Sequence, residues 1–375
     1  MKKVLAVIVT YNRLTQLKKT VAAIEAQQAD CDILLVNNAS TDGTEDWALS
    51  HGTDYGNQNP QKDCSDELPG GPDSGNRQFL YENTGANIGG AGGFQYGMRR
   101  GVELGYDAVW IMDDDAVPKP DTLEKLLLSD EALSDENGVP SYGFLSSVVR
   151  WTDGSLCEMN RQRLPSHYVQ EEDIQAALSK SERASAERTP IAHVKTQPVS
   201  ETEQSPEEHA AIAHVGTQQI PDSTRMPVEC ATFVSLLIPK ETILKVGLPI
   251  KEFFIWSDDV EYTSRITRRY SLPAYIVPES EIIHETKNNV GSDIVIDDAE
   301  RIDRYRYAYR NGCYAYRHFS ARMYISFLYH TMLTFFKIFG KAKDYKGKRA
   351  RVLLKGLFQG FVFHPKVEYV EPANQ

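Results

Sequence analysis

The order of hydrophobic and polar residues changes its period repeatedly through the first third of the chain. Val4–Thr10 is an almost continuous apolar run of strand length, and residues 14–28 repeat apolar side chains at helical spacing. The pattern continues with a strand at 33–37, a short helix at 44–50, a strand at 79–82, a helix at 93–105 and a strand at 108–112. Strands that alternate with helices are typical of a parallel sheet with right-handed crossovers. We therefore predict an α/β fold with a mainly parallel central sheet flanked by helices.

The later part of the chain is less regular. Further strands are predicted at 142–149, 228–238 and 274–277, with a short helix after Pro239 and a helix that ends near Arg269. Two polar segments interrupt this series. Residues 51–78 are rich in Gly, Pro and Asn and are predicted to leave the sheet as an excursion. Residues 158–226 contain almost no aromatic side chains and are predicted to form a partly mobile surface insertion, with some helix and no core of its own.

Charge divides the chain into two parts. The net charge is −11, but residues 301–375 carry 15 Lys and Arg against 4 Asp and Glu, whereas residues 1–300 carry 26 against 48. An acidic body argues against a general nucleic-acid-binding protein. We therefore separate a body, 1–300, from a basic helical region, 301–375. This region lies along an anionic membrane surface, or it packs as a helical pair against the body or a second subunit. Its aromatic character comes from Phe335, Phe336, Phe339, Phe358, Phe361 and Phe363.

Composition excludes several classes of protein. With 375 residues, 41% hydrophobic and 25% charged, the chain is neither wholly disordered nor a disulfide scaffold. Its five cysteines form no Cys-x-x-Cys pair, which favours reduced thiols in the cytoplasm over a thiolate zinc site. The first strand is too short for a signal peptide, and the longest later apolar stretch, 323–336, is too short to cross a membrane. We expect a cytoplasmic protein that is not integral to the membrane.

Three carboxylates follow the predicted strand at 108–112 directly. Side chains alternate along an extended backbone, so Asp113 and Asp115 can face one site while Asp114 points elsewhere. Adjacent negative charges need compensation, and oxygen ligands at the carboxyl end of a strand suit Mg²⁺ or Mn²⁺. The ordinary alternative is a solvated acidic turn before a helix near Asp121. The strongly apolar strand favours the metal site.

A glycine run lies between the strand at 79–82 and the helix at 93–105. Glycines at such a position let the backbone approach a diphosphate, although Gln95 stands where a dinucleotide-binding fingerprint needs its third glycine. A tight packing turn explains the same residues about equally well. The run contains Asn87, Gly89, Gly90, Gly92, Gly93 and Phe94.

Three further groups could carry chemistry. The acidic residues after Trp256 either cap a helix or include a general base for an acceptor hydroxyl. A lone histidine such as His284 is more often structural than a ligand. Arg310 and Asn311, in an aromatic and basic stretch, could bind phosphate, pack against the body or stack on a sugar ring.

Taken together, these motifs resemble family 2 inverting glycosyltransferases of GT-A fold. The resemblance covers roughly residues 1–120 and 228–311 and also includes the turns at 10–13 and 38–43. Asn37 stands where many members of the family have aspartate. The glycine run followed by a triple aspartate is most similar to galactofuranosyltransferases, and some rhamnosyltransferases are close relatives. The resemblance implies a GT-A catalytic domain over 1–300 with a C-terminal helical extension.

The resemblance also implies a role for each matching residue. Asp113, Asp115 and His284 would bind the metal ion, Mn²⁺ or Mg²⁺. Asp259 would be the catalytic base, with Asp258 and Glu261 positioning hydroxyl groups. Acceptor contacts would come from Trp256, Gly93 and Phe94. The nucleotide-sugar donor would be bound by Thr10, Tyr11, Asn12, Arg13, Asn38, Asn87, Gly89, Gly90, Gly92 and Asp114.

The function implied is metal-dependent, inverting transfer of galactofuranose from UDP-galactofuranose to a hydroxyl of a cell-surface glycan. The acceptor would be lipid-linked on the cytosolic leaflet, with the protein peripheral on the inner face of the membrane. Transfer of rhamnose from dTDP-rhamnose is the alternative. Two remoter alternatives are a phosphotransferase with an Asp-x-Asp nucleophile and a non-catalytic module of glycan assembly.

Overall fold

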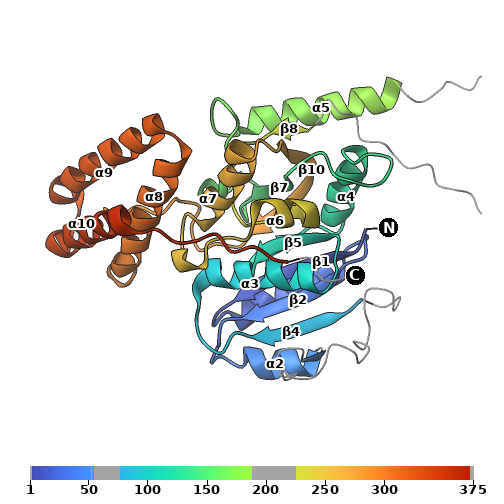
Figure 1. The fold of residues 1–375 in the computed structure, drawn as a ribbon, viewed down its shortest axis with the longest axis horizontal. Helices are drawn as coiled ribbons and strands as arrows, with labels where there is room; N and C mark the ends of the chain where they lie inside the picture. Colours follow the sequence, from blue (N-terminus) through green and yellow to red (C-terminus); the bar gives the residue numbers. More distant parts are fainter. Residues whose placement is uncertain (1, 52, 55–76, 188–224, 372–375) are drawn as a thin grey trace, which may run out of the picture.

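The computed structural model describes residues 2–51, 53–54, 77–187 and 225–371. Within them, ten strands form one mixed sheet in the order β3-β4-β2-β1-β5-β9-β7-β10-β6, with β8 paired to β10 (Figure 1). The first five strands in this order are mutually parallel, and β9 runs antiparallel to both of its neighbours. The strands are β1 Val4–Thr10, β2 Asp32–Asn37, β3 Thr53–Asp54, β4 Phe79–Asn83, β5 Ala108–Asp113, β6 Ala116–Pro118, β7 Phe144–Arg150, β8 Met226–Pro227, β9 Leu236–Pro239 and β10 Ala274–His284.

Helices cover both faces of this sheet, and three more form a lobe beside it (Figure 1). Helix α7 continues as a π-helical turn over Arg265–Arg269. The helices are α1 Leu14–Glu25, α2 Thr44–His51, α3 Gly89–Glu103, α4 Thr122–Ala132, α5 Glu171–Glu187, α6 Lys240–Val246, α7 Asp258–Ser264, α8 Tyr305–Phe319, α9 Ala321–Lys341 and α10 Lys346–Val362. This arrangement confirms the predicted fold class, a sheet flanked by helices with a C-terminal helical region.

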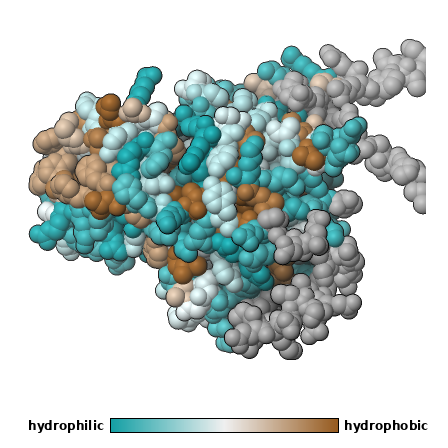
Figure 2. Space-filling model, in the orientation of Figure 1, coloured by the Kyte–Doolittle hydropathy of each residue, from teal (hydrophilic) through white to brown (hydrophobic). Residues whose placement is uncertain are grey.

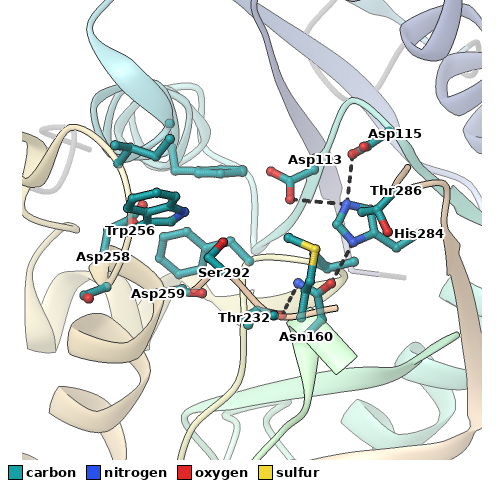
Figure 3. Close-up of a pocket in the computed structure, with 18 of the residues that line it drawn as sticks. Asp113, Asp115, Asn160, Thr232, Trp256, Asp258, Asp259, His284, Thr286 and Ser292 are labelled. Atoms are coloured by element: carbon teal, nitrogen blue, oxygen red, sulfur yellow. Dashed lines mark hydrogen bonds and ion pairs between the residues drawn. The ribbon is translucent and has the colours of Figure 1, made fainter. Parts of the chain in front are cut away.

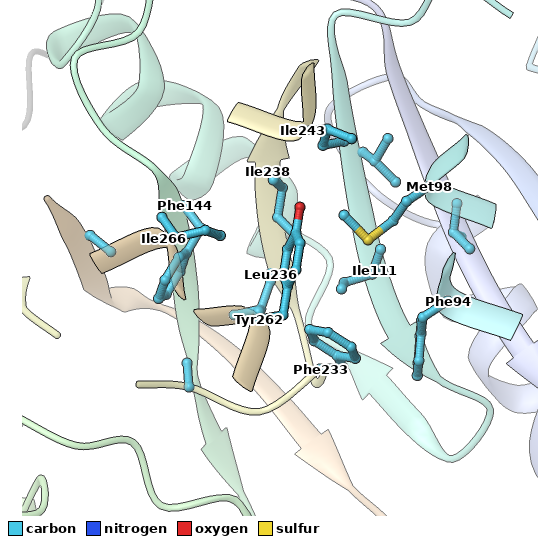
Figure 4. Packing of buried hydrophobic residues seen from close by; sticks show 14 of the residues in the cluster. Phe94, Met98, Ile111, Phe144, Phe233, Leu236, Ile238, Ile243, Tyr262 and Ile266 are labelled. Atoms are coloured by element: carbon cyan, nitrogen blue, oxygen red, sulfur yellow. The ribbon is translucent and has the colours of Figure 1, made fainter. Parts of the chain in front are cut away.

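Two hydrophobic clusters lie on the two faces of the sheet. Because side chains alternate along a strand, Leu5 and Val7 of β1 belong to one cluster, while Ala6 and Ile8 belong to the other. The first cluster joins α3, α6 and α7 to β5 and β9, and Figure 4 shows part of it. Its labelled members are Phe94, Met98, Ile111, Phe144, Phe233, Leu236, Ile238, Ile243, Tyr262 and Ile266. A central strand buried on both faces explains why β1 reads as one apolar run.

Helix α3 begins at Gly89, four residues before the predicted start. Its glycines let it approach the sheet closely: a Cβ atom on Gly93 would overlap the side chain of Val9, and one on Gly97 would overlap Val7. Close packing against β1 therefore explains why residue 93 is glycine. This agrees with the interpretation of the glycine run as a tight packing turn, as far as Gly93 is concerned.

Two strand predictions need correction. The apolar run 228–238 was predicted as one strand, but only Leu236–Pro239 forms β9, because Ser235 adopts a left-handed conformation (φ 59°) and Phe233 turns into the core. The strand predicted at 274–277 continues to His284 after a register shift between Val277 and Glu281.

The polar segments are described in part. Thr53–Asp54 pairs with β4 instead of leaving the sheet, and the rest of the predicted excursion, 55–76, lies outside the described residues. In the predicted insertion, α5 buries Ile174 in the first hydrophobic cluster, so this part shares the core of the sheet. Residues 188–224 lie outside the described residues.

The C-terminal lobe consists of α8, α9 and α10, with a small cluster of its own around Ile302, Ile338 and Leu353. After α10 the chain returns to the body (Figure 1). There Glu368 pairs with Arg99 at 2.8 Å, and the Leu248 N–H donates to the Glu368 carbonyl at 2.8 Å. No helix among the described residues is long and apolar enough to cross a membrane.

Candidate active site

The register of the parallel strands brings their carboxyl ends to one edge of the sheet. Thr10 is paired with Asn37, Asn37 with Asn83, and Asp113 with Val9. The loops that follow these strands therefore meet, as expected for ligand sites in open α/β sheets. A pocket of about 560 Å³ opens beside this edge. The predicted site residues that line it are Arg13, Gly90, Phe94, Asp113, Asp114, Asp115, Trp256, Asp258, Asp259 and His284.

Asp113, Asp115 and His284 form one cluster on a wall of this pocket (Figure 3). One ligand atom from each of the three residues lies within 4.8 Å of the others. The pairing of β6 with β10 puts His284 opposite Ala116, which brings the histidine beside the strand-end aspartates. His284 Nε2 lies 2.9 Å from Asp115 Oδ1 and 3.8 Å from Asp113 Oδ2. Asp115 and His284 are 169 residues apart in the sequence, and the pairing of β6 with β10 brings them into contact.

Asn160 fixes the orientation of the His284 ring. Its side-chain nitrogen donates to Thr232 Oγ1 at 3.1 Å, so its oxygen faces His284 Nδ1 at 2.7 Å. Because an amide oxygen only accepts, Nδ1 carries the proton of that hydrogen bond. Nε2 therefore points toward the two carboxylates, in the way that neighbours of metal-binding histidines usually orient the ring.

Two cationic groups compensate the acidic residues. Arg13 Nη2 donates to Asp115 Oδ2 at 2.6 Å, and Arg13 Nε lies 3.5 Å from Asp114 Oδ1. Burial favours a neutral His284, but its hydrogen bonds to Asp115 and Cys157 and the nearby negative charges raise its pKa to about 10. The carboxylates around His284 and Arg13 therefore favour positive charge at this wall of the pocket.

Asp114 points away from the other two carboxylates, as the alternation along the strand predicts. Its Oδ2 accepts from Thr10 Oγ1 at 2.7 Å, and its carbonyl accepts from Thr20 Oγ1 at 2.9 Å. Asp114 and Thr10 are both buried. These contacts hold the turn after β5 against β1 and α1.

The carboxyl groups differ in their affinity for protons. Asp113 leaves 41% of its side chain exposed to the pocket, but the surrounding protein still withdraws it from bulk water, and this burial, with the charges of Asp115 and Asp114, raises its pKa to about 7. Burial acts on Asp115 in the same direction, yet its contacts with His284 and Arg13 lower its pKa. A carboxyl group with a raised pKa gains from a bound cation, because the cation favours its charged form.

The opposite wall of the pocket carries a second acidic pair (Figure 3). Asp258 and Asp259 begin α7, and Trp256, whose ring lies 4.9 Å from that of Tyr305, stands beside them. Burial and the charges of Asp259 and Asp113 raise the pKa of Asp258 well above its usual value. Burial also raises the pKa of Asp259, to about 6, against the hydrogen bond that its carboxylate accepts from the Val260 N–H at 2.7 Å.

The loop before this acidic pair has an unusual backbone. Phe254, Trp256 and Ser257 have φ values of 65°, 68° and 65°, a region that costs free energy for residues other than glycine. The Asn311 side chain holds the loop by donating to the carbonyl oxygens of residues 253, 255 and 256, at 2.9, 3.0 and 2.9 Å. On its other side the loop touches α3, where the Ala91 N–H donates to the Phe254 carbonyl at 3.2 Å.

Asn311 is therefore expected to position the Trp256–Asp259 loop without touching the substrate. We expect Asn311→Asp, which keeps the shape but removes the N–H donors, to lower kcat at least about tenfold, because carbonyls left without a donor let the loop rearrange. Steady-state kinetics at a temperature where circular dichroism shows a folded protein checks this. Cys313→Ala, on the same helix, is the matched control. Equal turnover for Asn311→Asp and wild type would contradict the role.

The structure places other predicted residues outside the pocket lining. Glu261 is buried and pairs with Arg265 at 3.1 Å, while Gly92 lies against the Ile88 side chain and Gly93 against Val9. Thr10, Tyr11, Asn12, Asn38, Asn87 and Gly89 lie at or after the ends of β1, β2 and β4. Asn38 is buried and donates to the Gly89 carbonyl at 3.0 Å, so the two loops are joined. The roles of these residues toward a donor stay predictions.

Several lining residues were not found from the sequence. Met159, Asn160, Thr232, Thr286 and Ser292 also line the pocket, as does Tyr305 at the start of the aromatic and basic stretch that the sequence singled out. Asn160 lies in the segment predicted as a surface insertion, where polar composition gave no sign of a role. Thr232 lies in the run predicted as a strand. Only the pairing of distant strands brings them beside His284.

Comparisons with known proteins support the sequence interpretation over the first third of the chain. Residues 5–137 match the model of glycosyl transferase family 2. A segment of 125 residues is 31% identical to an undecaprenyl-phosphate mannosyltransferase of Micrococcus luteus. The aligned segment covers 33% of this chain and 43% of that protein. The chain thus spans less than half the length of this relative. The matched family region ends before Trp256, Asp259 and His284.

Solved structures are similar at low identity. A mannosyltransferase of Pyrobaculum calidifontis, in complex with GDP-Man and Mn²⁺, is 15% identical with a TM-score of 0.49, covering 96% of this chain and 87% of its own. S. aureus TarS 1–349 is 10% identical with a TM-score of 0.42, covering 96% and 72%. Residues 5–137 therefore resemble glycosyl transferase family 2, and they lie within a mixed sheet that is flanked by helices.

Proposed function

We propose that this protein is a metal-dependent inverting glycosyltransferase that transfers galactofuranose from UDP-galactofuranose to a hydroxyl group of a cell-surface glycan. One observation carries the proposal. A single pocket of about 560 Å³ has two carboxylates and an imidazole on one wall, and on the other a carboxylate with a pKa of about 6. The volume is in the range of ligand pockets.

The donor set fits a divalent cation. Carboxylate oxygens from Asp113 and Asp115 suit Mg²⁺ and Mn²⁺, and the oriented Nε2 of His284 adds a nitrogen ligand that Mn²⁺ accepts more readily. A bound cation would neutralise the negative charge that develops on a diphosphate leaving group. Arg13, which is held at Asp115 and lines the same pocket, adds a positive charge for the same anion.

Asp259 is proposed as the general base. A base must be ionised at the working pH and still bind a proton well, and a pKa of about 6 meets both needs. Asp258, whose pKa is raised by burial and by the charge of Asp259, is proposed to position the acceptor hydroxyl through a hydrogen bond. Attack by one activated hydroxyl on the face opposite the leaving group inverts the anomeric centre. Trp256 supplies an apolar ring beside this acceptor position.

The choice of donor rests on the resemblance of the glycine run and the triple aspartate to galactofuranosyltransferases. Transfer of rhamnose from dTDP-rhamnose is the alternative for the same reason. The match to a mannosyltransferase that acts on undecaprenyl phosphate favours a second candidate, a mannosyl donor with a polyprenyl phosphate acceptor.

A donor panel tests the proposal. The protein is incubated with UDP-galactofuranose, dTDP-rhamnose or GDP-mannose, with Mn²⁺, Mg²⁺ or a chelator, and released nucleoside diphosphate is measured. We expect release from UDP-galactofuranose that requires the metal and increases with a glycan acceptor. Preference for another sugar would overturn the donor assignment, and binding without release over any acceptor would favour the non-catalytic alternative.

The phosphotransferase alternative has a separate test. Such an enzyme forms an aspartyl-phosphate and uses a lysine partner, but no lysine lines the described part of this pocket. We expect no acid-stable, hydroxylamine-sensitive phosphate on the protein after incubation with phosphate donors. Its detection would revive that alternative.

The pH dependence of turnover follows from the raised pKa of Asp259. Only the ionised carboxylate accepts a proton, so kcat/KM at saturating metal should be half-maximal near pH about 6, level off about one pH unit above that value and approach a tenfold fall per pH unit below it. Initial rates from about pH 5 to about pH 8 measure this, with metal saturation checked at each pH. The residual activity of Asp259→Asn should lack this acidic limb. A wild-type profile that is flat across the range would contradict the assignment.

A further inference from the structure

The outer surface of α9 and α10 is apolar, although the protein leaves it uncovered. On α9, exposed residues repeat at intervals of four and three, which places them on one stripe of the helix. These residues are Ile325, Tyr329, Met332, Phe336 and Phe339. On α10 the exposed apolar residues are Leu354, Phe358, Phe361 and Val362. We call these nine residues the outer stripe.

The opposite side of α9 is already occupied. Thr331 and Ile338 are buried within the lobe, and the Phe327 ring stacks on Tyr316 at 5.2 Å. The helix is therefore apolar on two sides, whereas a helix at a protein surface is normally apolar only toward the core. Figure 2 shows hydrophobic atoms gathered over this end of the molecule. Exposed apolar residues gathered in this way mark an interaction surface.

Charge identifies what covers the stripe. Residues 321–362 contain nine Lys and Arg and only one acidic residue, Asp344. Asp344 pairs with the buried Arg349, so its charge does not neutralise the exposed cations. The exposed cations on these helices and the turn between them are Arg322, Lys337, Lys341, Lys343, Lys346, Lys348, Arg351 and Lys355, of which Lys348 pairs with Asp303 at 2.9 Å.

We propose that α9 and α10 lie on an anionic lipid surface, with the outer stripe in contact with the acyl chains and the cations at the headgroups. An aromatic and aliphatic stripe bordered by lysines is the arrangement by which helices bind in the plane of a bilayer. A second copy of this chain fits less well, because it would bring two sets of positive charges together. This inference is independent of the sugar that the enzyme transfers.

Vesicle flotation of the full chain tests the proposal. We expect wild-type protein to float with phosphatidylglycerol vesicles, to stay behind with phosphatidylcholine vesicles, and to be released as salt is raised toward about 1 M. Phe336→Ser with Phe358→Ser, which changes two residues that are 62% and 64% exposed, should abolish flotation. Val139→Ser, a 51% exposed apolar residue on the body, is the matched control and should float normally.

A second variant separates charge from packing. Lys341→Gln, Lys343→Gln and Lys355→Gln together should weaken binding to anionic vesicles about a hundredfold without changing the apolar stripe. Circular dichroism confirms that each variant is folded. Failure of the wild type to float with anionic vesicles, or equal binding to neutral ones, would overturn the proposal. So would a dimer in sedimentation velocity that the Phe336→Ser and Phe358→Ser pair dissociates.

Discussion

Asp115→Ala should abolish metal-dependent donor binding. Asp115 is the carboxylate that Arg13 and His284 both contact, at 2.6 and 2.9 Å. Removing it takes away a proposed metal ligand and also leaves two cationic groups without their shared partner, so the cluster would repel a divalent cation. Because loss of a residue that only supports a ligand costs 10–100-fold in metal affinity, we expect the Mn²⁺-dependent affinity for UDP to fall by at least about a hundredfold.

Titration calorimetry of UDP, with Mn²⁺ and with a chelator, measures this effect. Asp115→Asn serves as a second variant, because it keeps the volume of the side chain if alanine loosens the site. Asp121→Ala, in the turn before α4 and outside the pocket lining, is the control and should bind as wild type does. An unchanged difference between the two titrations in both Asp115 variants would show that this cluster does not hold the metal.

Asp259→Asn should bind the donor normally and lose turnover. The amide cannot accept the proton of an incoming hydroxyl, and general base catalysis contributes typically 10²–10⁴-fold, so kcat should fall by about that factor. The residues proposed to bind the metal and the donor lie on the other wall, so donor binding should be preserved. Titration of UDP with Mn²⁺ and single-turnover kinetics with UDP-galactofuranose separate the two steps.

The neighbouring carboxyl group provides a sharp control. Burial and the charge of Asp259 raise the pKa of Asp258 and so favour its neutral form, which Asp258→Asn imitates as a neutral hydrogen-bonding group of similar shape. We expect this variant to keep at least about a tenth of wild-type turnover, a loss no larger than that of one hydrogen bond. If Asp259→Asn were fully active and Asp258→Asn inactive, the two roles would have to be exchanged.

Local sequence was sufficient to predict the wall that holds Asp113 and Asp115. The strand before them is buried on both faces, so its apolar run is unambiguous, and the alternation of side chains separates Asp114 from its neighbours. Parallel strands then bring their carboxyl ends together without any further information. The fold class follows from the same regularity.

The rest of the pocket depends on contacts between residues far apart in sequence. Asn160 meets His284, over 124 residues of separation, because β10 pairs with β7 and the chain that follows β7 leads to Asn160. The left-handed turn at Ser235 interrupts a run whose composition is that of a strand. Likewise, the backbone of the Trp256 loop depends on a side chain from α8. Neither periodicity nor residue type carries such information.

The returning segment after α10 limits how the C-terminal lobe can be dissected. Gly247 lies so close to this segment that a Cβ atom on residue 247 would overlap Val367. Val370 is buried in the first hydrophobic cluster. Cutting the chain ahead of α8 would therefore remove this segment from the body and expose buried residues of the body. If a truncated protein failed to bind vesicles or to turn over substrate, the cause would be its lost stability. The lobe therefore has to be tested by surface substitutions that leave the segment after α10 in place.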